Sequence, residues 1–136
     1  MKKSILSLGV FVALAFTLGF NDPSEGNEDG PTIEFEKTVH NYGKIPHNGD
    51  GGCIFVFKNT GSKPLILNNV RSSCGCTTPK WPKNKPINPG ENDTINVRYN
   101  TRIVGNFTKS ITVYSNAVNK SPVRLTIKGQ VIKEKE

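Results

Sequence analysis

Two of the chain's three cysteines, Cys74 and Cys76, stand on either side of a single glycine, Gly75. Thiols this close in sequence can bond to each other, hold a soft metal ion together, or pair with the third cysteine, Cys53. A bond between Cys74 and Cys76 would close a very small ring, which favours exchange with other thiols over structural stapling. A bond from Cys53 to either cysteine would close a loop of about 20 residues and add roughly 3 kcal/mol in the chain-entropy treatment. The residues alone leave these pairings open.

The metal interpretation uses the same side chains. Two thiolates that flank a glycine can hold a soft ion such as Cu(I). Tetrahedral zinc needs four ligands, and Cys53, His40 and His47 are the residues that could complete the set. A C-x-C pair alone is not specific for a metal, and both histidines lie near expected turns, where surface positions are usual. Cys74 and Cys76 are therefore metal candidates only, and the sequence predicts no cofactor.

Other chemistry finds little support in the sequence. No serine has the context of a nucleophile elbow. The few acidic residues fall at expected strand edges or turns, which disfavours paired-carboxylate catalysis. The formal net charge is +7, but the lysines and arginines are scattered and not interleaved with stacking aromatic residues, so nucleic acid is not an expected partner. We expect a protein that is not an enzyme.

The N-terminus has the pattern of an export signal. Lys2 and Lys3 precede an apolar run over residues 5–18, which is shorter than the roughly 20 residues of a membrane span. We predict a signal peptide at residues 1–19 and a flexible, acidic tether at residues 20–31. The exported protein would be periplasmic, extracellular or part of the cell envelope, without a transmembrane span after cleavage. The remaining predicted parts are one domain at residues 32–133 and a charged tail at residues 134–136.

From residue 31 onward, the apolar residues recur with period two and not with a helical period. Residues 123–132 alternate most cleanly, with Leu125 and Ile127 on the predicted inner face. Cys53 alternates with Phe55 and Phe57, which predicts that it is a small buried side chain. Glycine, asparagine and proline punctuate the chain as turns require. The pattern predicts an all-β protein, an immunoglobulin-like antiparallel β-sandwich of about seven strands, at residues 32–36, 39–45, 52–59, 65–71, 94–99, 107–115 and 123–132.

The cysteine motif leads into a proline-rich connection over residues 78–86. We expect this connection not to pair in a sheet, because proline lacks the N–H group. Within it, Trp81 is expected to close one end of the sandwich, with stacking on a ligand as the alternative. Gly75 is expected to adopt a backbone conformation that a side chain would hinder.

Open sheets in a small sandwich have edge strands that can accept a strand from a partner. Two segments, residues 32–36 and 108–114, are the expected edges, because their threonine and serine side chains leave the backbone accessible. Partner binding by strand addition is the hypothesis that follows.

A series of short motifs resembles one exported bacterial family, the domain of unknown function 1573. In order these are Ile33-x-Phe35, Tyr42-Gly43-x-Ile45, Phe55-x-Phe57-Lys58-Asn59-Thr60-Gly61, Leu65-x-Leu67-x-x-Val70, Ser73-Cys74-Gly75-Cys76-Thr77, Trp81-Pro82, Pro86-Ile87-x-Pro89-Gly90-Glu91, Gly105-x-Phe107-x-Lys109 and Val113-x-Ser115-Asn116.

The resemblance implies an immunoglobulin-like fold related to the major sperm protein and PapD chaperone group, and it implies no reaction or catalytic residue. The family motif matches at Cys74 and Cys76, whereas Cys53 stands where a small apolar residue is expected. The resulting expectation is a non-catalytic binding or assembly module of the bacterial envelope, whose partner is another envelope protein. The alternative is a thiol redox or Cu(I)-handling protein that uses Cys74-Gly75-Cys76.

Overall fold

The computed structural model describes residues 29–134. The predicted signal peptide, most of the predicted tether and the last two residues of the predicted tail lie outside the described residues. The described part contains eight strands and no helix, so nowhere in residues 29–134 is there a helix long and apolar enough to cross a membrane. The strands are β1 (Ile33–Phe35), β2 (Val39–Pro46), β3 (Gly52–Asn59), β4 (Leu67–Ser72), β5 (Thr77–Lys80), β6 (Asn92–Tyr99), β7 (Gly105–Ser115) and β8 (Val123–Ile132).

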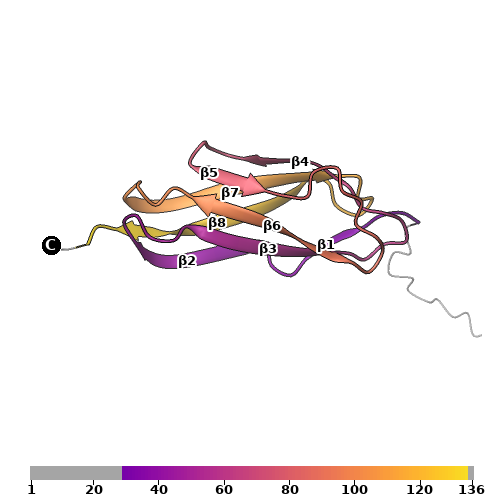
Figure 1. The fold of residues 1–136 in the computed structure, drawn as a ribbon, viewed down its shortest axis with the longest axis horizontal. Coiled ribbons are helices and arrows are strands. Elements are labelled where there is room, and N and C mark those ends of the chain that lie inside the picture. Colours follow the sequence, from indigo (N-terminus) through magenta and orange to yellow (C-terminus); the bar gives the residue numbers. More distant parts are fainter. Residues whose placement is uncertain (1–28, 135–136) are drawn as a thin grey trace, which may run out of the picture.

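The strands form two four-stranded sheets that face each other (Figure 1). One sheet has the order β1-β3-β6-β5 and the other has the order β2-β8-β7-β4. This is an immunoglobulin-like arrangement. β1 pairs with β3 at the edge of one sheet, and the chain then crosses to the other sheet, where β2 pairs with β8. The prediction of an all-β immunoglobulin-like sandwich is confirmed. One pairing differs from the antiparallel expectation, since β2 runs parallel to β8.

The predicted alternation produces the core between the sheets. Phe55 and Phe57 of β3 are fully buried, as are Leu125 and Ile127 of β8. Cys53 belongs to the same buried set, as its alternation with the two phenylalanines predicts. Every second residue of these strands turns to the opposite face, so a period of two is all that the sequence needs to specify two buried sheet faces.

Two expectations about pairing are wrong. The proline-rich connection does contribute a strand, because Thr77–Lys80 forms β5 and pairs with β6. Proline is tolerated there because β5 is the outermost strand and has one side free of ladder hydrogen bonds. Residues 108–114 are not an edge, since β7 lies between β8 and β4. Their polar side chains belong to the solvent-facing side of a central strand.

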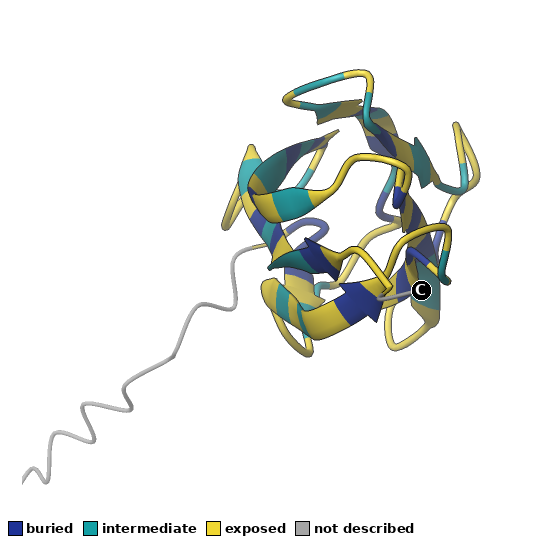
Figure 2. Cartoon of the chain, turned by 90° about the vertical axis from the view of Figure 1, so that its left-hand side faces the viewer, coloured by how far each residue is buried: buried dark blue, intermediate teal, exposed yellow. Residues whose placement is uncertain are grey.

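Three connections meet at one end of the sandwich, on the left in Figure 1. They are the turn over residues 47–51, the bend over residues 73–76 and the connection over residues 100–104. The backbone ties them together, because Asn48 N donates to Thr101 O at 3.1 Å and Asn100 N donates to Cys76 O at 2.8 Å. We call this the cysteine end. Figure 2 looks onto it and shows that much of the chain facing the viewer is exposed.

Candidate functional site

The bend between β4 and β5 carries the cysteine motif, and a disulfide joins Cys74 to Cys76. Cys53 is the free cysteine of the described chain and is buried. The structure therefore selects the small ring and not the longer loop to Cys53. The reason is the direction in which the side chains point. Cys53 points from β3 into the core, whereas the other two cysteines lie on a bend at the end of the sandwich.

Hydrogen bonds from neighbouring strands fix the position of the bend. Ser73 N donates to Ser110 O of β7 at 2.8 Å, and Ser110 N donates to Ser73 Oγ at 3.1 Å. On the other side, the Cys76 carbonyl accepts the bond from Asn100 already described. The Ser72 hydroxyl donates to Cys74 O at 2.7 Å. These hydrogen bonds tie the bend to both sheets, so they fix its position independently of the disulfide.

Two donors point at the sulfur atoms. Cys76 N donates to Cys74 Sγ at 3.3 Å. The Thr77 hydroxyl lies 4.0 Å from Cys74 Sγ and 3.8 Å from Cys76 Sγ. Thr77 is only 2% exposed, and within residues 29–134 the two sulfur atoms are the polar partners of its hydroxyl. A buried hydroxyl needs a partner, so Thr77 and the disulfide form one polar unit.

Gly75 does not meet the expectation that a side chain would hinder its backbone. Its φ lies outside the left-handed range, and a Cβ atom added there would meet nothing within 4 Å. The residue is exposed at the tip of the bend. Apart from its two neighbouring cysteines, nothing in the described chain would therefore hinder a side chain at this position.

A polar groove of about 800 Å³ opens beside the disulfide and includes Gly75 and Cys76 in its lining. Arg98 and Arg102 also line it, together with backbone and polar side chains from the turn and connection of the cysteine end. No aspartate or glutamate is among these lining residues. Neither arginine forms an ion pair with another residue of the described chain. The groove is therefore a positively charged surface next to the disulfide.

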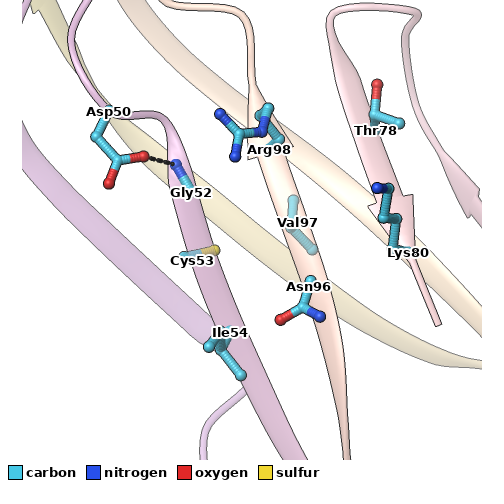
Figure 3. Close-up of a pocket in the computed structure, with 9 residues that line it drawn as sticks. All are labelled: Asp50, Gly52, Cys53, Ile54, Thr78, Lys80, Asn96, Val97 and Arg98. Atoms are coloured by element: carbon cyan, nitrogen blue, oxygen red, sulfur yellow. Dashed lines mark hydrogen bonds between the residues drawn. The ribbon is translucent and has the colours of Figure 1, made fainter.

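A second hollow, of about 780 Å³, continues along the outer face of the β3-β6-β5 strands (Figure 3). It shares Thr78 and Arg98 with the polar groove. Strand register explains its shape, because Gly52, which has no side chain, lies beside Arg98. Asp50 stands at its margin and accepts a hydrogen bond from Gly52 N at 2.8 Å. The two hollows form one surface that runs from the disulfide to Ile54.

The structure does not assemble the zinc ligand set considered above. Within residues 29–134, no three histidine, cysteine, aspartate or glutamate side chains lie close enough to hold one ion. His40 instead accepts a hydrogen bond from Lys37 Nζ at 2.9 Å. Burial, with Lys37 as the second cause, lowers the pKa of His40. The side chain lies edge-on to Tyr42 at a centroid distance of 4.5 Å.

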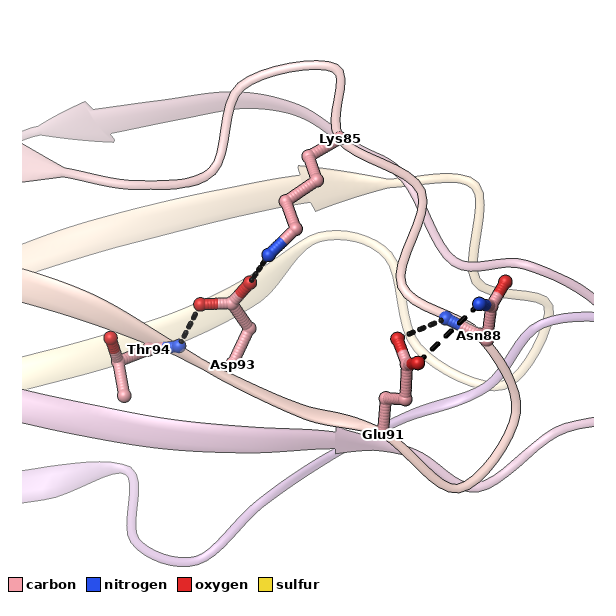
Figure 4. A network of polar contacts seen from close by, with 5 residues as sticks. All are labelled: Lys85, Asn88, Glu91, Asp93 and Thr94. Carbon is pink, nitrogen blue, oxygen red and sulfur yellow. Dashed lines mark hydrogen bonds and ion pairs between the residues drawn. The ribbon is translucent and has the colours of Figure 1, made fainter.

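Acidic residues near the β5–β6 connection stabilise local structure (Figure 4). Asp93 accepts a bond from Lys85 Nζ at 3.1 Å and another from Thr94 N at 2.7 Å. Glu91 accepts from the backbone N–H of Asn88 at 3.0 Å. These carboxylates bind separate partners and do not face each other.

Comparison with known proteins places the chain in a family. The family model described as "Protein of unknown function (DUF1573)" matches residues 33–131. The chain belongs to this family. Among curated proteins it is 31% identical over 111 residues to the human "Hydrocephalus-inducing protein homolog", a match that covers 79% of this chain and 2% of that protein. The chain thus spans a very small part of that relative.

Solved structures show the same fold. A protein of unknown function from Porphyromonas gingivalis W83 has a TM-score of 0.68 and 17% identity, over 82% of this chain and 51% of that one. The ASH / PapD-like domain of human CEP192 has a TM-score of 0.63 and 10% identity, over 76% and 87% of the two chains. The CsuC–CsuE chaperone–tip adhesion subunit complex of Acinetobacter baumannii matches with a TM-score of 0.51 and 12% identity, over 74% and 57%.

Trp81 follows β5 in this family member and lines neither hollow. It is partly buried and packs against the hydrophobic core. The closing of one end of the sandwich by Trp81 stays a prediction.

Sequence reasoning missed Arg98, Arg102 and Thr77 as parts of the site. The two arginines lie on β6 and on the following connection, with no motif to mark them. Thr77 was visible only as part of the cysteine motif. Its role depends on a β5 strand that turns its hydroxyl inward toward the sulfur atoms, which the proline-rich sequence argued against.

Cys53 differs from the motif cysteines in its surroundings. Burial raises the pKa of the Cys53 thiol, and the Tyr42 hydroxyl and Lys37 only partly oppose this effect. The Tyr42 hydroxyl donates to Gly51 O at 2.8 Å and so stays beside the core. Cys53 is therefore a protonated core thiol at neutral pH.

After mild reduction, we expect Cys74 or Cys76 to react with iodoacetamide faster than Cys53, because a thiol must be accessible and ionised to react. Mapped alkylation over time on the folded, reduced protein measures this. A urea-unfolded sample, in which all three sites should label at similar rates, is the control. Fast labelling of Cys53 with the other two protected would contradict the exposed position of the bend.

Proposed function

We propose that this protein is a non-catalytic binding or assembly module of the bacterial envelope, and that it binds another envelope protein by pairing with a strand of that partner. The observation that carries the proposal is an uncovered stretch of the β3 edge. β1 pairs with β3 only at Phe57, Lys58 and Asn59. No strand of the described chain lies beside residues 52–55 on that side.

The hydrogen-bond alternation identifies the free groups. Tyr99 N donates to Gly51 O at 2.8 Å and Asn59 N donates to Glu91 O at 3.0 Å, so the odd-numbered residues of β3 face β6. The even-numbered residues turn their backbone groups outward. Val56 O is taken by Glu36 N at 3.0 Å, which leaves the N–H and C=O of Ile54 available. The Ile54 side chain is 53% exposed and adds an apolar contact.

Each of the remaining edges is blocked or interrupted at one point. On β5, Thr77 N donates to Cys74 O at 3.4 Å and Pro79 has no N–H. On β1, the Asn119 side chain bonds both the N–H and the C=O of Ile33, each at 3.0 Å. A register shift breaks β2 between Asn41 and Lys44. A bridge to Lys83 covers the start of β4. Such features protect edges from pairing, so β3 is the edge best suited to a partner.

The comparisons support this role at the level of fold. The similar Acinetobacter structure is a chaperone bound to a tip adhesion subunit before assembly. Export to the envelope is part of the proposal and is supported by the expected signal at residues 1–19.

We expect Ile54→Pro to keep the fold and to weaken strand addition roughly tenfold or more, because it removes an outward N–H that no internal bond uses. The probe is a short extended peptide selected from a displayed library against the wild-type protein. Hydrogen exchange should show new protection at the Ile54 amide when the peptide binds.

Ile54→Val is the matched control, since it keeps both the backbone donor and an apolar side chain, and its affinity should stay close to that of the wild type. Selected peptides that bind Ile54→Pro at full strength, or that protect amides of β2 or β4 instead, would show that the β3 edge is not the binding site.

A further inference from the structure

The Cys74–Cys76 disulfide contributes little as a structural cross-link. The ring that it closes contains one residue between the cysteines. The entropic stabilisation from a cross-link grows with the length of the closed loop, so this ring constrains the unfolded chain least. Hydrogen bonds to Ser110 and Asn100 already hold the bend. Both cysteines are partly exposed. A role other than stabilisation is needed to account for the bond.

The donors around the sulfur atoms favour a thiolate. The Cys76 N–H points at Cys74 Sγ, and the buried Thr77 hydroxyl is within reach of both sulfur atoms. Hydrogen bonds to a charged acceptor are stronger than those to a neutral one. The same two donors therefore stabilise Cys74 more as a thiolate than as half of a disulfide, which makes it a good leaving group.

The groove determines which thiols approach. Cys76 lines it together with Arg98 and Arg102, and no acidic side chain is among its lining residues. Because both arginines lack ion-pair partners in the described chain, their positive charges act on any molecule that enters the groove. Positive charge beside a reactive sulfur attracts anionic reactants and raises their encounter rate.

We propose that Cys74 and Cys76 form a thiol–disulfide exchange site for anionic thiols. A thiolate of the reductant attacks Cys76 Sγ and forms a mixed disulfide, while the Cys74–Cys76 bond breaks and its electron pair leaves on Cys74 Sγ. A second reductant thiolate attacks the reductant sulfur of the mixed disulfide and releases Cys76 as a thiolate. Two external thiolates are thereby oxidised to one disulfide, and their two electrons reduce Cys74 and Cys76 to thiolates, which take up protons from water. The reverse sequence oxidises the pair with an external disulfide.

Charge selectivity is the first test. The oxidised full chain is treated with mercaptoacetate, 2-mercaptoethanol or cysteamine, which are anionic, neutral and cationic thiols. Each rate is divided by the rate of the same thiol with bis(2-hydroxyethyl) disulfide, which is uncharged. The normalised rate should be highest for mercaptoacetate and should fall as salt is added. Arg98→Ala and Arg102→Ala should each lower it by about two- to fivefold. Arg124→Ala, on the β8 strand of the other sheet, should not change it.

The Thr77 hydroxyl gives the second test. In Thr77→Val the side chain keeps its shape and loses the donor, so the reduced pair should alkylate about two- to tenfold more slowly at neutral pH. Thr108→Val is the matched control, because Thr108 is exposed on β7 of the other sheet, lines neither hollow beside the disulfide and forms no hydrogen bond to sulfur. Urea unfolding of both variants separates a loss of reactivity from a loss of fold.

Several outcomes would overturn the proposal. If intact mass finds three free thiols in protein kept under oxidising conditions, the disulfide does not form. Equal normalised rates for the three thiols would show that the charge of the groove does not select the reacting thiol. Tight stoichiometric Cu(I) binding by the reduced chain, with a disulfide that no thiol reduces, would make the pair a metal site instead. None of these results depends on the β3 edge, so they leave the binding proposal to its own test.

Discussion

Leu125→Ala is expected to lower the free energy of unfolding by about 2–5 kcal/mol. Leu125 is fully buried in β8, and β8 lies between β2 and β7. Truncation removes buried methyl groups and leaves a cavity whose walls belong to both sheets, so the surroundings cannot close on it without moving strands. Urea unfolding measures the loss as a shift of the midpoint at constant slope.

Arg124→Ala is the control for this substitution. The neighbouring side chain faces solvent on the same strand and forms no ion pair with another described residue. The expected change in unfolding free energy is below about 0.5 kcal/mol. Comparable losses at both positions would show that the strand register is wrong, because alternation requires the two faces to differ.

The period of two was sufficient to predict the fold because each sheet buries one face. Phe55, Ile95 and Leu125 are all fully buried, and each follows from its local pattern alone. The sequence is less informative about which strand lies at an edge. A polar outer face looks the same on a central strand as on an edge strand, so residues 108–114 were misjudged. Which strands pair depends on contacts between residues distant in sequence, and the pattern within one strand carries no information about its neighbours.

The β5 strand shows the same lack of information about neighbouring strands, but here a strand was missed because of its proline. Pro79 argues against a strand when ladder hydrogen bonds are expected on both sides. On an outermost strand, the missing N–H faces away from the sheet and costs no ladder bond. The parallel β2–β8 pairing also depends on this kind of information, since it arises only when the chain passes from one sheet to the other after β1.

The candidate site divides in a similar way. The cysteine motif could be recognised from spacing, but spacing could not choose its pairing, because Cys53 was an equally available partner. The choice depends on direction, since Cys53 turns into the core. Arg98 and Arg102 line the same groove as Cys76 only because the β4–β5 bend and the β6–β7 connection meet at one end of the sandwich.

Gly51→Ala is expected to destabilise the fold by about 3 kcal/mol. Gly51 is buried, and an added Cβ would overlap the Tyr99 carbonyl oxygen and lie 3.0 Å from Thr101 Cγ2. Because the obstacle is backbone, relief requires β3 and β6 to separate at this point. The bonds from Tyr99 N and the Tyr42 hydroxyl to Gly51 O, each 2.8 Å long, would weaken together. Urea unfolding and the exchange rate of the Tyr99 amide measure the effect.

Gly75→Ala provides the matched comparison at the same end of the molecule. An alanine Cβ there meets nothing within 4 Å, so the stability should stay within about 0.5 kcal/mol of the wild type. The two substitutions add the same methyl group, and only the surroundings differ. An unchanged urea midpoint for Gly51→Ala would mean that β3 and β6 do not pack as closely at Tyr99 as described. A large loss at Gly75 would mean that the bend is not open to solvent, and the disulfide would then be too enclosed for exchange with external thiols.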